Sequence, residues 1–114
     1  MFMRSVFWLT CTVLAISSLL PSEQIPQIFN FWDKAQHAIA FFAISVVGFS
    51  TFPSAIFRVS SGLLVYGVGI ELAQAATGWR FGDWQDWMAD VLGVGAAHLV
   101  WFFTMFLKNR FNTV

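Results

Sequence analysis

Four apolar runs, each approaching the length that crosses a lipid bilayer, limit what this chain of 114 residues can fold into. The runs cover approximately residues 3–20, 35–52, 57–77 and 89–107. A membrane-spanning α-helix needs roughly 17 to 25 predominantly apolar residues. Pro21, Pro53 and the segment from Gly78 to Gly82 interrupt the runs, and such residues commonly end helices. We therefore predict an all-α fold, a polytopic membrane protein formed by an antiparallel bundle of four transmembrane helices.

The composition agrees with a membrane environment. Hydrophobic residues make up 58% of the chain and charged residues only 11%, against roughly 25% charged in soluble domains. The length fits one membrane domain over residues 1–114 without a separate soluble catalytic domain, so any chemistry must come from the helices and their short loops. The net charge of zero gives no sign of a nucleic-acid partner, and the predicted partner is the lipid bilayer.

The first run could also be a secretory signal peptide, because Arg4 precedes an apolar stretch. The residues that follow, Ser18-Leu19-Leu20-Pro21, match a small-x-small cleavage site poorly. We therefore expect the run to remain in the membrane as a spanning helix.

The basic residues predict which way the bundle faces. With four helices, both termini lie on the same side of the membrane as the loop around Pro53. That side carries four basic residues and no acidic one: Arg4, Arg58, Lys108 and Arg110. The other side carries two basic and four acidic residues: Lys34, Arg80, Glu23, Asp33, Asp83 and Asp86. Because Lys and Arg are retained in cytoplasmic loops, we expect a multi-pass protein of the cytoplasmic membrane with both termini in the cytoplasm.

Polar residues form one face on each of three predicted helices, and all three faces begin at the same membrane boundary. The pairs, in chain order, are Asp33 and His37, Glu71 and Gln74, and Asp86 and Asp90. Residues three or four apart share one face of a helix. Gly67 and Gly93 lie on these faces, and small residues let membrane helices approach closely. We expect the acidic faces to meet inside the bundle.

The order of these residues resembles the VanZ-like family of small bacterial membrane proteins. The resemblance rests on Asp33-Lys34-x-x-His37-x-x-x-Phe41, Gly67-x-x-x-Glu71-x-x-Gln74, Arg80, Asp86 and Asp90-x-x-Gly93, over about residues 30–97. It implies a protein of the bacterial inner membrane and cell envelope. The family name derives from a member linked to low-level resistance to the glycopeptide teicoplanin. Many relatives carry asparagine at the position of Asp90.

The polar faces predict an outward-facing site for a lipid-linked or phosphate-bearing envelope molecule. The catalytic candidates are His37, Glu71, Asp86 and Asp90, because histidine titrates near neutral pH and clustered carboxylates can act as bases. Glu71, Asp86 and Asp90 are also candidate ligands for Mg²⁺ or Mn²⁺. The predicted ligand-binding residues are Arg80, Lys34, Gln74 and Asp33. Arg80 could hold a phosphate or a carboxylate through its planar guanidinium group.

Two other interpretations stay open. A non-enzymatic proton-linked transporter subunit or membrane interaction protein would use the same acids and histidine as a relay, and four short helices would then need a homo-oligomer or a partner. A purely structural cluster would gain little, because interhelical hydrogen bonds average about 0.6 kcal/mol in membranes. His98 lies off the acidic face of the fourth helix, and we expect it to be packed and hydrogen-bonded.

Overall fold

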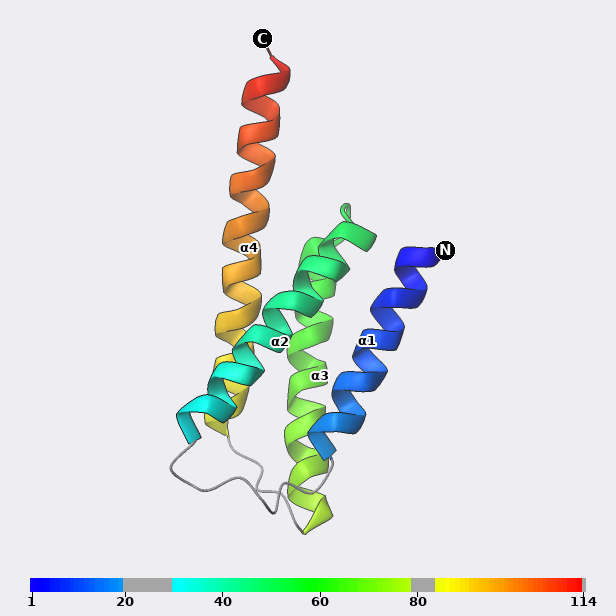
Figure 1. The fold of residues 1–114 in the computed structure, drawn as a ribbon, viewed down its shortest axis with the longest axis vertical. Helices are drawn as coiled ribbons and strands as arrows, with labels where there is room; N and C mark the ends of the chain where they lie inside the picture. Colours follow the sequence, from blue (N-terminus) through cyan, green and yellow to red (C-terminus); the bar gives the residue numbers. More distant parts are fainter. Residues whose placement is uncertain (20–29, 79–83, 114) are drawn as a thin grey trace.

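The computed structural model describes residues 1–19, 30–78 and 84–113, without the side chains of residues 30–33. These residues form four α-helices: α1 (Phe2–Leu19), α2 (Asn30–Thr51), α3 (Ile56–Thr77) and α4 (Trp84–Asn112). Successive helices run in opposite directions, so that α1 begins and α4 ends toward the same end of the bundle (Figure 1). The predicted all-α antiparallel bundle is confirmed.

Among the described residues, three helices are long and apolar enough to cross a membrane, namely α1, α3 and α4. The remaining helix, α2, has 22 residues. At 1.5 Å per residue it extends roughly 33 Å, which matches a hydrocarbon core of about 30 Å. Its hydropathy is lower because Lys34, Gln36 and His37 lie in its first turns. The fold is therefore that of a membrane protein with polar residues at one end of its second helix.

Proline and glycine end two of the helices, as their backbone chemistry requires. Helix α2 ends at Thr51, and Phe52 still donates its backbone N–H to Gly48 before Pro53 breaks the pattern. Helix α3 ends at Thr77, and the capping residue Gly78 adopts a left-handed conformation with φ of 79°. Glycine accepts this conformation because it has no Cβ.

The largest differences between predicted and observed helix bounds occur where the helices are polar. Helix α2 begins at Asn30, although the apolar run begins near residue 35, and α4 covers Trp84–Asn112 and not 89–107. Asp86 lies in the first turn of α4 and Arg110 in its last turn. An acid at the start and a base at the end of a helix stabilise it through the helix dipole. The predicted bounds followed hydropathy. They therefore left out the polar first turns of α2 and α4 and the polar end of α4.

Helix α2 contacts each of the other three helices, and its most extensive contact is with α4. The apolar core takes residues from all four helices: Phe7, Phe41, Ile44, Leu63, Ile70 and Val94. Within the described ranges, α1 packs against α2 and α3 but not against α4. The core thus holds α2 in place between α1 on one side and α4 on the other.

Candidate functional site

The candidate site lies where the backbones of α2 and α4 pack against each other. Gly93 of α4 makes this packing possible, because a side-chain carbon at this position would overlap the carbonyl oxygen of Ala38 and lie 2.9 Å from the nitrogen of Phe42. Small residues allow such close helix contacts in membranes. His37 directly precedes Ala38 on α2, and Asp90 lies one turn before Gly93 on α4. The contact between Ala38 and Gly93 therefore brings His37 opposite Asp90.

His37 lies between two carboxylates of α4. Its Nδ1 is 3.0 Å from Asp90 Oδ1, and its Nε2 is 4.0 Å from Asp86 Oδ2. Lys34, one turn earlier on α2, places its Nζ 3.3 Å from Asp86 Oδ1. The two pairs follow the same order along both helices, because α2 and α4 run in the same direction (Figure 1). The acidic face of α4 and the basic face of α2 are therefore in register.

Helix α3 contributes Glu71, which is buried with only 8% of its surface exposed. One potential ligand atom from each of His37, Glu71 and Asp90 lies within 4.8 Å of the other two. Gly67, one turn before Glu71, makes room for the approach, because a side-chain carbon there would lie 2.9 Å from Asp90 Oδ2. Three helices thus each bring one polar residue to a shared point inside the bundle.

Asp90 is the most enclosed carboxylate of the cluster, with 1% of the residue exposed. Its Oδ1 faces His37, whereas its Oδ2 has no hydrogen-bond partner among the described residues. A buried carboxylate oxygen is stabilised by a donor, a proton or a cation. Asp90 therefore offers an acceptor atom at the centre of the cluster.

Among the described residues, His37, Glu71 and Asp90 form a set that could hold a divalent metal ion. The set predicted from the sequence was Glu71, Asp86 and Asp90. In the structure His37 takes the place of Asp86, whose carboxylate lies beside Lys34. Mg²⁺ prefers oxygen ligands, whereas imidazole nitrogen suits transition metals. Of the two predicted ions, Mn²⁺ fits this mixed donor set better than Mg²⁺, and Zn²⁺ also accepts such ligands.

The other predicted site residues lie apart from this cluster or outside the described residues. The buried side chain of Gln74 donates to the carbonyl oxygen of Ser18 in α1, over 2.8 Å. Gln74 therefore links α3 to α1. Asp33 lies in α2, but its side chain is outside the described part of the chain, and Arg80 also lies outside it. Their predicted roles stay predictions.

Trp87 belongs to the surroundings of the cluster. Its indole nitrogen donates to the carbonyl oxygen of Leu64 in α3, over 3.0 Å. The ring also lies against Gly67, since a side-chain carbon there would be 3.2 Å from Trp87 Cδ1. Trp87 follows Asp86 directly and precedes Asp90 by three positions. This spacing is the signal that could have placed it in the α3–α4 contact.

His98 is packed and hydrogen-bonded, as expected from its position off the acidic face. Its Nε2 lies 2.5 Å from the hydroxyl oxygen of Ser60 in α3. Its ring packs between aromatic side chains, stacking on Phe102 and tilted against Phe49 and Phe57. His98 therefore belongs to the α3–α4 packing and not to the cluster around His37.

The fold and the site define a class: an all-α membrane protein whose helices enclose a cluster of carboxylates and one histidine. In comparisons with known proteins, no family model, no curated protein and no solved structure matches the chain. Its function must therefore be inferred from the chemistry of the cluster itself.

Proposed function

We propose that His37, Glu71 and Asp90 form a divalent-cation site that binds a phosphate-bearing or lipid-linked molecule of the bacterial cell envelope. One observation carries the proposal: a nitrogen and two carboxylate ligands from three helices lie within 4.8 Å of one another. Two carboxylates balance the charge of one divalent cation. Such a site would bury no net charge, which offsets the large penalty for isolated charges in a membrane.

Phosphate is the ligand class that this chemistry favours. A protein-bound divalent cation commonly completes its coordination with phosphate oxygens. Lys34 lies beside the cluster with 29% of its side chain exposed, so its ammonium group can reach a ligand while Asp86 holds it in place. Arg80 precedes α4 in the sequence and is the proposed second phosphate contact, through its planar guanidinium group.

The proposed location is the outer face of the bacterial inner membrane. The cluster residues belong to the first half of α2, the first half of α4 and the second half of α3, and these segments lie toward the end of the bundle opposite the start of α1 and the end of α4 (Figure 1). The basic residues Arg4, Arg58, Lys108 and Arg110 are at the other end, which the positive-inside rule assigns to the cytoplasm. The resemblance to the VanZ-like family suggests the same cellular location and a link to glycopeptide resistance. If the bound molecule is also turned over, Asp86 is the catalytic candidate, because it lies beside the cluster and is not one of the proposed ligands.

Manganese binding by the full-length protein tests the proposal. Electron paramagnetic resonance of the detergent-purified protein titrated with Mn²⁺ should show one bound ion per chain. Native mass spectrometry of the same sample should show a copurified phosphate-bearing lipid. The Mn²⁺ signal, and any lipid adduct that depends on the bound ion, should be lost in His37→Gln and in Glu71→Gln, because each variant replaces one ligand with a neutral amide.

The matched control is His98→Gln, which replaces another half-buried histidine that contacts Ser60 outside the cluster. It should bind Mn²⁺ like the unmodified protein. No specific binding by the unmodified protein, or equal binding by all three variants, would contradict the proposed site.

A proton-linked carrier is the second candidate, and one observation favours it. His37 lies 3.0 Å from a carboxylate oxygen of Asp90 and 4.0 Å from one of Asp86, which is an arrangement suited to relaying protons. A transport path would then require a homo-oligomer or a partner. Proton flux into liposomes that is lost in His37→Gln but insensitive to metal chelators would support the carrier over the cation site.

A further inference from the structure

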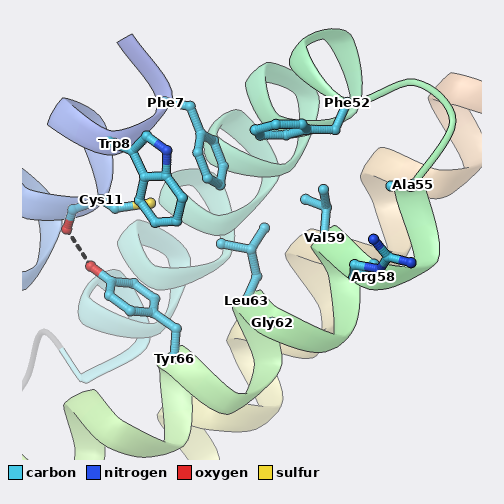
Figure 2. Close-up of a pocket in the computed structure, with 10 residues that line it drawn as sticks. All are labelled: Phe7, Trp8, Cys11, Phe52, Ala55, Arg58, Val59, Gly62, Leu63 and Tyr66. Carbon is cyan, nitrogen blue, oxygen red and sulfur yellow. Dashed lines mark hydrogen bonds between the residues drawn. The ribbon is translucent and has the colours of Figure 1, made fainter. Parts of the chain in front are cut away.

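A second site lies nearer the other end of the bundle, where α1 and α3 begin. A cavity of about 410 Å³ separates the first halves of these two helices. Figure 2 shows that its walls are mainly apolar, with the large side chains Phe7, Trp8, Phe52, Val59 and Leu63 around it. Its volume lies within the roughly 300–1,000 Å³ range of small-molecule sites.

Tyr66 and Cys11 bound the cavity at its end farthest from the starts of α1 and α3. There the hydroxyl group of Tyr66 donates to the carbonyl oxygen of Cys11, which ties α3 to α1 (Figure 2). Gly62 lies along an open side of the cavity, and a side-chain carbon at this position would meet no atom within 4 Å. The shape is that of an apolar slot between two membrane helices, with room for an acyl chain.

Positive charge lies beside the slot. Arg58, in the first turn of α3, is one of the lining residues. Arg4, in the first turn of α1, lies over the ring of Phe52, 5.6 Å from its centroid. The Asp and Glu side chains that the structure describes belong to the polar cluster toward the opposite end: Glu71, Asp86 and Asp90. Nothing acidic in the described part of the chain therefore offsets the two arginines at this end.

We infer that the slot binds an anionic phospholipid, with one acyl chain between α1 and α3 and the headgroup phosphate at Arg58. Any phospholipid can place an acyl chain in an apolar slot, but only a headgroup with net negative charge gains from two neighbouring cations. Basic pockets between membrane helices bind anionic headgroups for this reason. The positive end of the α3 dipole, at Ala55 in the cavity lining, adds to the attraction. This site does not depend on the proposed cation site.

Native mass spectrometry with defined lipids tests the inference. The purified protein is mixed with equimolar dioleoyl-phosphatidylglycerol and dioleoyl-phosphatidylethanolamine, which differ in headgroup charge but not in acyl chains. Phosphatidylglycerol adducts should exceed phosphatidylethanolamine adducts about 30-fold, since each of the two arginines contributes roughly 1 kcal/mol. In Arg58→Gln, where only Arg4 remains, the ratio should fall to about five-fold. Lys108→Gln, an exposed basic residue of α4 away from the slot, should keep the preference.

A pair of glycine substitutions tests the slot itself. Gly62→Leu adds a side chain along its open side, whereas Gly69→Leu adds the same side chain to the same helix away from the lining. Neither position has an atom within 4 Å of the new Cβ, so neither change should disturb the packing. Gly62→Leu should reduce adducts of both lipids, and Gly69→Leu should not. Equal binding of the two lipids, an unchanged ratio in Arg58→Gln, or equal effects of the two leucines would overturn the inference.

Discussion

Replacing Gly93 with alanine should weaken the contact between α2 and α4 that holds the polar cluster together. The new methyl carbon would lie 2.9 Å from the nitrogen of Phe42, 3.1 Å from the carbonyl carbon of Ala38, and closer still to the Ala38 oxygen. Carbon atoms pack best at about 3.5–4.0 Å, so α2 would have to move by roughly 1 Å. All three neighbours are helix backbone, and no side-chain rotation can relieve the overlap.

The expected loss of unfolding free energy is best judged against Gly95, a second glycine on the same helix. Overpacking a filled site costs about 1–3 kcal/mol. Gly95→Ala makes the same chemical change at a position where the new carbon meets nothing within 4 Å. There the better helix propensity of alanine should stabilise the protein by up to about 1 kcal/mol. Gly93→Ala gains the same propensity, so the difference is the overpacking cost, and this variant should unfold with a free energy about 1–3 kcal/mol below that of Gly95→Ala.

Tryptophan fluorescence during unfolding by sodium dodecyl sulfate in mixed micelles measures this difference. Mn²⁺ affinity gives a second readout, because moving α2 would separate His37 from Asp90. Equal unfolding free energies for the two variants would refute the reasoning. The helices would then not be in backbone contact at Gly93, and the geometry of the cluster would lose its main support.

Two further substitutions test individual hydrogen bonds between helices. Trp87→Phe removes the bond to the Leu64 carbonyl and should lower the unfolding free energy by about 0.5–1.5 kcal/mol, whereas the exposed Trp84→Phe should change it by less than about 0.5 kcal/mol. Gln74→Leu removes the bond to the Ser18 carbonyl and should lower the unfolding free energy by about 0.6–1.7 kcal/mol in the same assay. It should leave the Mn²⁺ stoichiometry unchanged, and loss of the ion would instead place Gln74 in the cation site.

The fold could be predicted from the sequence because hydropathy and helix-breaking residues carry most of the information. Four runs interrupted by proline and glycine define four helices, and short connections make neighbouring helices antiparallel. Hydropathy fails where a polar residue is helical and inside the bundle. Asp86 is buried within α4 and pairs with Lys34 of α2, and each of these residues precedes the apolar run of its helix, so both helices begin before their apolar runs.

The composition of the site was only partly predictable, since a helix face does not specify depth along the axis. Asp86 and Asp90 share a face, but four residues separate them by about 6 Å along the helix. Which of them meets Glu71 depends on the relative height of α3 and α4, and glycine contacts such as that of Gly67 with Asp90 set that height. Gln74 is three residues from Glu71, about 60° around the helix, and this offset turns it toward α1.

The energetics of Asp90 connect the geometry to the proposed chemistry. Burying a charged carboxylate inside a protein costs several kcal/mol, whereas an interhelical hydrogen bond in a membrane returns about 0.6 kcal/mol on average. The single bond to His37 therefore does not offset the burial of Asp90, with its second oxygen lacking a hydrogen-bond partner in the described residues. To offset the cost of its burial, the Asp90 carboxylate requires either a bound proton or a bound cation. A bound proton is the state expected for the proposed proton relay and a bound cation the state expected for the proposed cation site, so identifying what occupies the space between His37, Glu71 and Asp90 distinguishes the two proposals.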